Sequence, residues 1–297
     1  MTFDPSLVGS ILVDEDRRWT TADTCLYALG IGAGAVDPTA ELDFTTENTA
    51  GRDHRVHPSF SVVLSSVPGA SALDRIGDYD KEMLVHGEQS FAIEEPIPPE
   101  GAARVTTHLS GIHHKGSGAL VVTETFGRRE QGAGESSLLF RTRASYFIRG
   151  AHGLDPQPQP QGQPDWVAPE RPADTIVTQP TRADQPLLYR LSGDGNPLHS
   201  DPAVARRAGF PRPILQGLCT FGFAARAIGT AAGRNDAGRV RQMAGRFTRP
   251  VLPGLPLKTR MWVEAEEILF QTLQDNTIVI DRGRASLDTT GDTVGAA

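Results

Sequence analysis

The sequence predicts an α+β protein of two units in tandem, in each of which an antiparallel sheet wraps around an apolar helix. The first of three observations behind this fold class is a proline-rich segment that divides the 297 residues into two halves. In each half, helical patterns come first, and alternating runs rich in Val, Thr and Phe follow. The second half also carries a long apolar stripe of helical period. The halves share no visible sequence identity, so we expect any duplication to be old or only structural.

The composition is that of a globular protein with a sizeable core. Hydrophobic residues make up 38% of the chain and charged residues 22%. The net charge is −7 and the Lys and Arg residues are dispersed, so no nucleic-acid partner is expected. A few local Arg and Lys side chains can still bind a phosphate-bearing substrate. The two cysteines, Cys25 and Cys219, form no Cys-x-x-Cys motif, which excludes a zinc ribbon or disulfide framework and favours a reducing cytosol.

Targeting and membrane signals are missing from the sequence. The first residues lack the basic region and apolar run of a signal peptide. No stretch reaches the ~18–20 apolar residues of a membrane span. The final Thr-Val-Gly-Ala-Ala carries no peroxisomal or endoplasmic-reticulum signal. We therefore expect a cytoplasmic protein with no membrane partner.

The proline-rich segment at 151–172 is predicted to be a semi-rigid linker, because its prolines favour extended polyproline geometry. It separates an N-terminal unit at 1–150 from a C-terminal unit at 173–297. In the N-terminal unit, a short capped helix is expected from Asp23, and a second helix is expected to begin at His57. Strands are predicted at 88–94, 104–112, 120–126 and 138–147, where Val, Thr and Phe are common.

The C-terminal unit is predicted to contain two helices and then strands. Asp201 is a helix N-cap before Pro202, and Gly209 ends that helix. A second, central helix is expected to end near 229–233, because apolar residues recur at steps of 4, 3, 4 and 3. These residues are Ile214, Leu218, Phe221, Ala225 and Ile228. Strands are then predicted at 242–247, 257–266 and 276–281.

The loop ahead of these helices concentrates residues that suit acid–base chemistry. Asp194, Asn196 and His199 lie within six positions, in a segment too rich in Gly and Pro to be regular helix or strand. An acid–base pair beside a helix N-terminus suits the addition or removal of water next to a thioester carbonyl. In this hypothesis Asp194 and His199 hold the water, and the backbone amide of Gly217 stabilises the oxyanion.

The same residues also have an ordinary structural interpretation. Gly-Asp-Gly-Asn-Pro is good turn chemistry, and an Asp and a His five positions apart are more often a solvated turn acid and a surface histidine. Asn196 either orients the loop or binds substrate, or it closes an Asx turn through its own backbone. The residue pattern alone leaves these alternatives open.

Residues 189–220 resemble the signature of the MaoC-like, or hydratase 2, family of (R)-specific 2-enoyl-CoA hydratases, which have the hotdog fold. The similarity continues at 246–254 and, in the N-terminal half, at 27–32, 84–89 and 115–118, so it covers nearly the full chain. The N-terminal segments are similar to those of the eukaryotic-type two-hotdog enzymes. The resemblance implies a double hotdog in one chain, with two antiparallel sheets each wrapped around a central helix. It also implies a homodimer.

The resemblance assigns roles to the loop residues and to each half. It implies that Asp194 and His199 are the acid–base pair and that the Gly217 amide is the oxyanion donor. It also implies that the N-terminal half is not catalytic and binds the acyl chain in a tunnel; no second Asp-x-Asn-Pro-x-His occurs in 1–150. One departure is Gln216, where the family usually has His. An amide does not titrate, but activity is expected to survive because His199 supplies the imidazole.

Other polar residues carry weaker signals. Arg246, Arg249 and Lys115 either pair with coenzyme A phosphates or are ordinary solvated charges. His86 and Glu88 are interpreted as structural residues between the halves. The Gly-rich run at 28–34 follows a helix instead of a strand, and the histidines form no His-Glu-x-x-His motif. Neither a dinucleotide site nor a metal site is therefore expected.

The sequence thus predicts a hydro-lyase of fatty-acid metabolism. The expected reaction is the reversible syn hydration of a trans-2-enoyl-CoA to an (R)-3-hydroxyacyl-CoA, with no cofactor and with coenzyme A only as part of the substrate. One alternative is a dehydratase that acts on 3-hydroxyacyl groups of acyl carrier protein, in fatty-acid or polyketide synthesis. Another is a non-catalytic acyl-thioester binding protein, which the substitution at Gln216 suggests.

Overall fold

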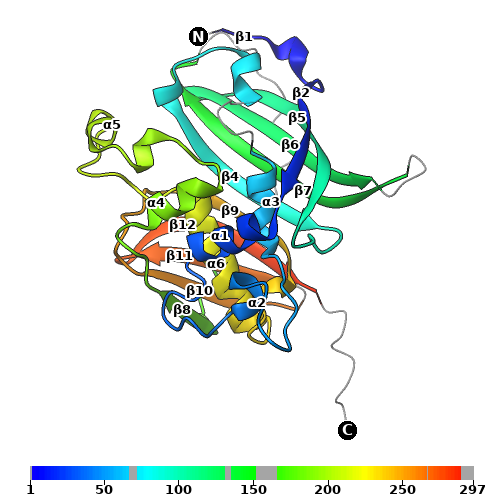
Figure 1. The fold of residues 1–297 in the computed structure, drawn as a ribbon. Coiled ribbons are helices and arrows are strands. Elements are labelled where there is room, and N and C mark those ends of the chain that lie inside the picture. Colours follow the sequence, from blue (N-terminus) through cyan, green and yellow to red (C-terminus); the bar gives the residue numbers. More distant parts are fainter. Residues whose placement is uncertain (1, 67–71, 131–134, 152–165, 266, 289–297) are drawn as a thin grey trace.

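A ten-stranded antiparallel sheet runs through the whole molecule (Figure 1). The computed structural model describes residues 2–66, 72–130, 135–151, 166–265 and 267–288. The strand order is β2-β5-β6-β7-β4-β9-β12-β11-β10-β8, so the first five strands precede residue 151 and the last five follow it. The N-terminal strands are β2 (Ile11–Trp19), β4 (Leu84–Ile93), β5 (Gly101–Lys115), β6 (Gly118–Glu130) and β7 (Ser136–Arg149). The C-terminal strands are β8 (Thr175–Gln179), β9 (Val240–Phe247), β10 (Leu257–Val263), β11 (Ile268–Gln274) and β12 (Thr277–Leu287).

The pairing of β4 with β9 joins the two halves into one sheet. Glu88 lies opposite Arg246, and the ladder continues to Ala92 opposite Gln242. Just before this ladder, the His86 ring packs against Tyr146 and Phe247, with ring centroids 4.8 and 5.0 Å away. Burial lowers the pKa of His86 to about 4, so the ring is neutral and packs as an aromatic side chain. The prediction that His86 and Glu88 lie between the halves is confirmed.

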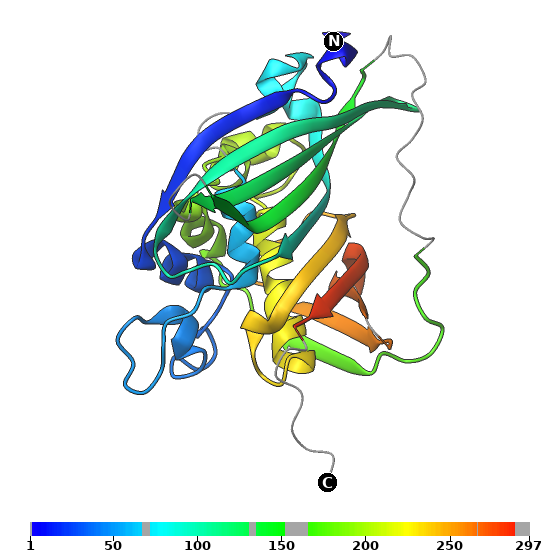
Figure 2. The same cartoon turned by 90° about the vertical axis from the view of Figure 1, so that its right-hand side faces the viewer.

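Helix α6 (Gly217–Ala232) covers the inner face of the C-terminal strands (Figure 2). Its apolar stripe is buried, including Phe221, Ala225 and Ile228. The Phe221 ring meets that of Phe91 on β4 edge to face, with centroids 6.0 Å apart, so the core is continuous across the two halves. The predicted central helix of the C-terminal unit is therefore confirmed.

The N-terminal half departs from the expected plan of one long helix in each half. Its strands β4 and β7 contact α3 (Ser61–Leu64), which continues from η2 (Pro58–Phe60) to make a helical segment of seven residues. The hydroxyls of Ser65 and Ser66 donate to the carbonyls of Ser61 and Val62 at its C-terminal end. A segment this short covers only part of the inner face. Across the described residues of this half, the long helix that would fill the remainder is absent.

Two of the shorter helices begin directly after residues whose side chains cap them. Helix α1 (Thr21–Gly30) starts two residues before the expected Asp23, because Thr20 is the N-cap and Asp23 closes a capping box. Helix α5 (Pro202–Arg207) has Asp201 as its N-cap, as predicted. Helix α2 (Leu42–Thr45) is a single turn, and α4 (Gln185–Tyr189) precedes the loop of the candidate site. Within the described ranges, no helix has both the length and the apolar character needed to cross a membrane.

The strand predictions identified most of the sheet but not its extent. Three strands of this sheet were not predicted: β2, β8 and β11. The separate pair of β1 (Thr2–Phe3) with β3 (Gly77–Asp78) was not predicted either. The charged run at 14–18 conceals β2, which lies at an edge of the sheet where charged side chains are usual. Strand β10 ends at Val263 instead of 266, because the chain turns there into β11. Strand β12 runs six residues past the expected end, through a bulge next to Arg282, whose φ is 54°.

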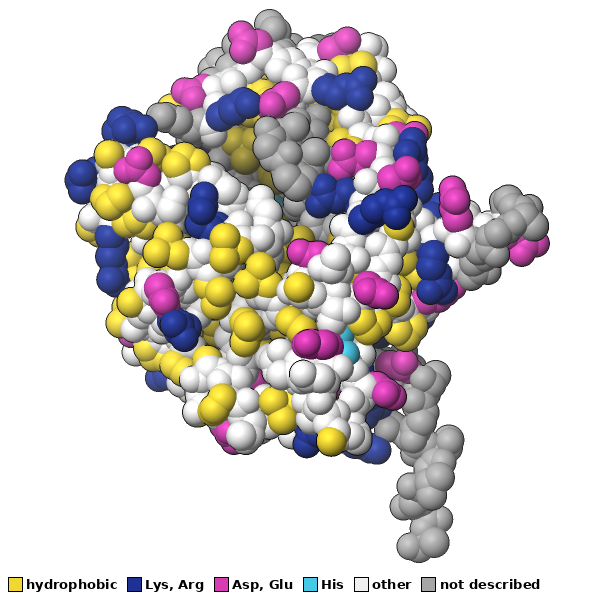
Figure 3. All heavy atoms as spheres, in the orientation of Figure 1, with side chains coloured by type: hydrophobic (Ala, Val, Ile, Leu, Met, Phe, Trp, Pro, Cys, Tyr) yellow, Lys and Arg dark blue, Asp and Glu magenta, His cyan; other side chains and the backbone are white. Residues whose placement is uncertain are grey.

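The prediction of a linker at 151–172 falls mainly on 152–165, which lie outside the described residues. The unit boundaries at 150 and 173 stay a prediction. Across the face shown in Figure 3, Lys and Arg side chains are interspersed with Asp and Glu. This dispersal agrees with the charge pattern of the sequence.

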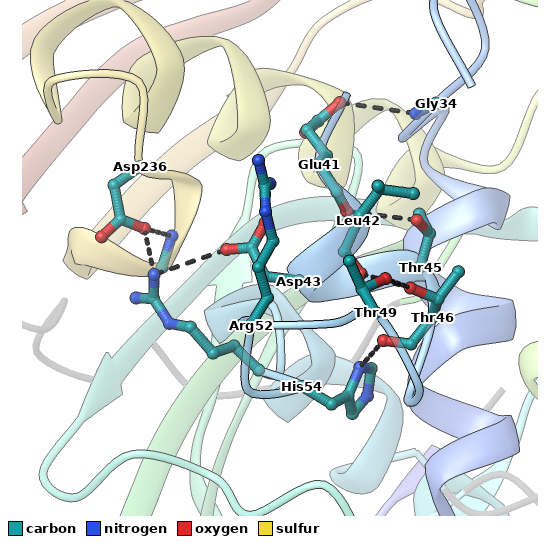
Figure 4. Close-up of polar contacts among 12 residues, drawn as sticks. Gly34, Glu41, Leu42, Asp43, Thr45, Thr46, Thr49, Arg52, His54 and Asp236 are labelled. Atoms are coloured by element: carbon teal, nitrogen blue, oxygen red, sulfur yellow. Dashed lines mark hydrogen bonds and ion pairs between the residues drawn. The ribbon is translucent and has the colours of Figure 1, made fainter. Parts of the chain in front are cut away.

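The segment after α1 ties the N-terminal half to α6. The Arg226 guanidinium of α6 donates to both Glu41 carboxylate oxygens, at 2.8 and 2.7 Å, and to the Ile31 carbonyl at 3.0 Å. Nearby, Arg55 pairs with the carboxylates of Asp236 and Asp43, at 2.9 and 3.6 Å. Figure 4 shows that these two aspartates come from separate segments of the chain. The Arg226–Glu41 pair is largely buried, with 11% and 21% of the side chains exposed. Removing one partner therefore leaves a charge in a poorly solvated place.

We predict that Arg226→Met lowers the free energy of unfolding by about 2–4 kcal/mol, because the Glu41 carboxylate and the Ile31 carbonyl lose their donor. Urea denaturation measures this change. The matched control is Arg104→Met, because Arg104 pairs with Asp14 and Asp16 on the exposed surface, where ion pairs stabilise little. Equal losses in the two variants, or no loss in Arg226→Met, would contradict the prediction.

Candidate active site

A cavity of about 510 Å³ lies between the two halves and contains the loop that the sequence singled out. The C-terminal half contributes Asp194, Gly195 and Asn196 to its wall. The N-terminal half contributes side chains of α3 and of the inner face of the sheet. The volume is within the ~300–1,000 Å³ of pockets that enclose small-molecule ligands.

Turn chemistry sets the shape of the loop. Gly193 has a φ of 118°, which is readily available only to glycine. The Asp194 carboxylate accepts from the Asn196 N–H at 3.2 Å, and the Asn196 side-chain oxygen accepts from the Leu198 N–H at 3.0 Å. Asn196 therefore caps the short helix η6 (Pro197–His199), as its Asx-turn interpretation predicts. Both turns hold Asp194 toward the cavity and fix the direction of the chain into His199.

The His199 ring is held by its Nδ1 atom, which lies 2.9 Å from the Ile214 carbonyl oxygen. A carbonyl only accepts, so Nδ1 carries the hydrogen, and in the neutral ring Nε2 keeps its lone pair. Burial lowers the pKa of His199, while the nearby Asp194 charge and the bond to Ile214 oppose the shift. The ring is therefore neutral at neutral pH, with an available base beside a carboxylate. His199 adjoins Asp194 but is not among the cavity-lining residues.

The N-terminus of α6 lies next to this pair. Gly217 is its first residue, and its N–H has no acceptor among the described residues, as is usual in the first turn of a helix. A β-carbon at Gly217 would lie 3.5 Å from the Phe247 ring, an ordinary contact. The protein itself thus has room for a methyl group there, so packing does not require the glycine. Leu218, the next residue, lines the cavity.

Gln216 has a structural role beside the site. Its side chain is fully buried, and Nε2 donates to the Pro186 carbonyl at 3.0 Å. Oε1 is buried without a hydrogen-bond partner. The contact ties the start of α6 to α4, and the last residue of α4, Tyr189, lines the cavity. Gln216 itself does not line it, so the family's usual His is replaced here by an uncharged structural donor.

The three basic residues predicted to contact coenzyme A lie at different places, and Arg249 precedes the segment that pairs with Leu215 ahead of α6. It is exposed just after β9, two residues before Val251, whose carbonyl accepts from the Leu215 N–H at 2.8 Å. Arg246 is the neighbour of Phe247 on β9, and because alternate strand residues face opposite sides, it faces away from α6. Lys115 is exposed at the turn between β5 and β6. Over the described ranges, no contact joins Lys115 to either arginine.

Sequence reasoning missed several residues of the cavity. Tyr189 lies inside the quoted signature, but a buried tyrosine carries no distinctive sequence signal. Its hydroxyl has no partner, and its pKa is raised mainly by burial and also by charges that include Asp194. Burial and Asp194 likewise raise the pKa of the Cys219 thiol, so this cysteine is a core side chain and not a nucleophile. In the part of the chain that the structure describes, no group of three His, Cys, Asp or Glu side chains could hold a metal ion.

Comparisons with known proteins agree with this fold. A family model described as MaoC like domain matches residues 165–282, and one described as MFE-2 hydratase 2 N-terminal domain matches residues 18–150. The 3-hydroxyacyl-thioester dehydratase Y of Mycobacterium tuberculosis is 39% identical over 92% of both chains. The chain belongs to the MaoC-like hydratase/dehydratase family. Within that family it is an enzyme of the hydro-lyase class.

Other relatives and solved structures support the same assignment. The peroxisomal enoyl-CoA hydratase 2 of Arabidopsis thaliana is 39% identical and covers 91% of this chain and 90% of its own. A MaoC-like dehydratase from Phytophthora capsici has a TM-score of 0.84 at 29% identity and covers 97% of this chain and 98% of its own. A Mycobacterium tuberculosis protein described as a double hotdog has a TM-score of 0.56 at 14% identity and covers 94% and 96%. The fold of this chain is a double hotdog, as the sequence predicted.

We predict that the His199 ring titrates below pH 6.5 and that kcat/KM falls as the pH drops through that lowered pKa, because a protonated Nε2 accepts no proton. Asp194→Asn is expected to lower the pKa of His199 further, since it removes a charge that opposes the shift. NMR titration of the ring measures both values. Asp201→Asn is the matched control: Asn also caps α5, so the His199 titration should stay in place. An upward shift in Asp194→Asn would contradict the prediction.

We predict that Gln216→Ala lowers the free energy of unfolding by about 1–3 kcal/mol, because the Pro186 carbonyl loses its buried donor. Gln216→His is expected to lose less stability, since an imidazole N–H can donate to the same carbonyl. Thermal unfolding and kcat are measured for both variants. If Gln216 took part in the chemistry, both variants would lose the same amount of kcat, whatever the difference between their stabilities.

Proposed function

We propose that this enzyme catalyses the reversible syn hydration of trans-2-enoyl-CoA to (R)-3-hydroxyacyl-CoA in fatty-acid metabolism. The observation that carries the proposal is the neutral His199 ring beside Asp194, with Nδ1 bonded to Ile214 and Nε2 left as a base. The relatives named enoyl-CoA hydratase support this substrate class. A catalytic role for Asp194, His199 and the Gly217 amide is part of the proposal.

The acid–base pair acts on one water molecule. In the hydration direction, Nε2 of His199 takes a proton from the water as its oxygen bonds to the β-carbon. Asp194 orients the water, takes the proton from the His199 imidazolium and gives it to the α-carbon, so the water's H and OH are added across the double bond and both side chains return to their starting protonation states. Dehydration runs the same steps in reverse. Positioned acid–base groups of this kind typically contribute ~10²–10⁴-fold in rate.

The N-terminus of α6 stabilises the negative charge on the thioester oxygen. The free N–H of Gly217 points out of a 16-residue helix, so the helix dipole adds to the hydrogen bond. One such donor typically lowers the barrier by about 3 kcal/mol. Because Gly217 has no side chain, the acyl carbonyl can approach this N–H closely. Asn196 keeps the loop in place through its cap on η6.

The remaining assignments belong to the same proposal. The acyl chain extends into the N-terminal half, which has no catalytic role, and coenzyme A takes part only as a portion of the substrate, with no separate cofactor or metal. Arg249 contacts the coenzyme A phosphates in this proposal, with Lys115 and Arg246 as more distant contributors. We also propose a homodimer. Peroxisomal names belong to the relatives, and a cytoplasmic location for this chain stays a proposal.

A dehydratase acting on acyl carrier protein is the second candidate. A relative from Mycobacterium tuberculosis is named 3-hydroxyacyl-thioester dehydratase Y. That name does not say whether coenzyme A or a carrier protein holds the thioester, so we retain this candidate. A folded protein on a carrier must reach the same cavity from outside, so the surface around its mouth would contribute to binding. Kinetics with the same acyl group on coenzyme A and on acyl carrier protein separate the two candidates.

We predict that the protein consumes the enoyl-thioester absorbance of crotonyl-CoA and trans-2-decenoyl-CoA and forms the (R)-alcohol. Asp194→Asn and His199→Gln are each expected to lower kcat by at least ~10²-fold, because the acid–base pair is broken. Asp201→Asn, a matched change on the same loop, should keep the wild-type rate. Tight binding of enoyl-CoA with no turnover by folded wild type would instead identify a non-catalytic acyl-thioester binding protein.

A further inference from the structure

A row of threonines crosses the wall of the cavity on the N-terminal sheet. Thr107 on β5 lies opposite Thr125 on β6, which lies opposite Thr142 on β7. In the next row, Thr123 on β6 lies opposite Ala144, which pairs in turn with Gln89 on β4. These four threonines and Gln89 all line the cavity, and each is no more than 6% exposed. The wall facing the acyl chain is therefore polar.

The hydroxyls of this wall keep unused hydrogen-bonding capacity. The Thr107 and Thr125 oxygens are 2.8 Å apart, so one of their two hydrogens is used between them and the other is available. Thr142 donates to the Ser65 hydroxyl at 2.8 Å, which leaves its own oxygen free to accept. The Thr123 hydroxyl has no protein partner in the described part of the chain. A saturated acyl chain lying on this wall would displace water from these hydroxyls without forming hydrogen bonds to them.

A second threonine pair shows what a purely structural arrangement looks like in the same protein. Thr259 on β10 lies opposite Thr272 on β11, with their hydroxyls 3.1 Å apart and exposures of 1% and 0%. This pair lies in the C-terminal sheet and lines no part of the cavity. The N-terminal row differs because it faces open volume next to the reactive loop. Valine has nearly the same shape, so a wall meant only for hydrocarbon would not require the hydroxyls.

We infer that the acyl group of the preferred substrate carries a neutral oxygen function, a hydroxyl or an oxo group, beyond its reacting carbons. The inference rests on the proposed hydratase function and specifies its substrate class. The wall recognises that oxygen through Thr123 and through the free positions of Thr107, Thr125 and Thr142. A carboxylate is disfavoured as the tail group, because Arg17, the one Lys or Arg among the described residues of the cavity wall, already has its charge balanced by Glu15 at 3.3 Å.

The test compares two series of trans-2-enoyl-CoA substrates, of eight, ten and twelve acyl carbons, each with and without a terminal hydroxyl. At the length that reaches the wall, the hydroxylated substrate is expected to have a kcat/KM about two- to tenfold higher than its alkyl counterpart, the worth of one net hydrogen bond. Thr123→Val should lower kcat/KM for the hydroxylated substrate and raise it for the alkyl one. The double variant Thr107→Val, Thr125→Val should shift the preference in the same direction.

Two controls keep the outcome interpretable. Thr259→Val changes a threonine of the same pairing type outside the cavity and should leave both series unchanged. Crotonyl-CoA carries no tail to place on the wall, so Thr259→Val should hydrate it at the wild-type rate. For the wall variants the readout is the ratio of kcat/KM between the hydroxylated and alkyl substrates, with thermal unfolding as the check of folding. Preference for alkyl substrates at every length, with no effect of Thr123→Val, would overturn the inference. If wild type failed on crotonyl-CoA, the proposed function would fail, and calorimetric binding of the two series would still test the wall.

Discussion

The antiparallel ladder between β4 and β9 is the constraint on which the rest of the structure depends. It makes one sheet from two halves, so the inner faces of both lie on the same side. That arrangement places the helix of one half beside the open sheet face of the other. The neutral His86 ring, between Tyr146 and Phe247, closes the joint, and Phe247 reaches the start of α6. Without the ladder, the loop at Asp194 would have no second wall.

The two halves differ in how much helix covers their strands, and this difference gives them different roles. Sixteen residues of α6 fill the C-terminal face and deliver a free amide at Gly217. Among the described residues, a short helical segment ending in α3 lies against the N-terminal strands, and the volume left over becomes the cavity. The same fold thus places the loop of Asp194 and His199 on one side and open volume on the other. The Arg226–Glu41 pair holds the two parts in place by anchoring α6 to the segment after α1.

Electrostatics around the site favours one titrating group. Burial lowers the pKa of His199, and the bond from Nδ1 to Ile214 leaves Nε2 as its one free nitrogen. Gln216 occupies the position of the family's second imidazole and donates to Pro186 without a charge of its own. A neutral donor there holds α4 without responding to pH. The acid–base behaviour of the site therefore depends on His199, and the structural contact of Gln216 does not change as that ring titrates.

By itself the sequence determined the local features of this protein: the turn from Asp194 to His199, the apolar stripe of α6 from Leu218 to Ile228, and most strands. These follow from turn chemistry and from periods of 2 and 3.6, which neighbouring residues encode. Only the tertiary structure decided that Ile214, the predicted first residue of the stripe, lies ahead of α6, and that β2 is an edge strand. It also decided that no long helix among the described residues covers the N-terminal strands, and that Thr107, Thr125 and Thr142 face a cavity. A period of 2 separates the two faces of a strand, but which face is enclosed depends on strand pairing between residues far apart in the chain.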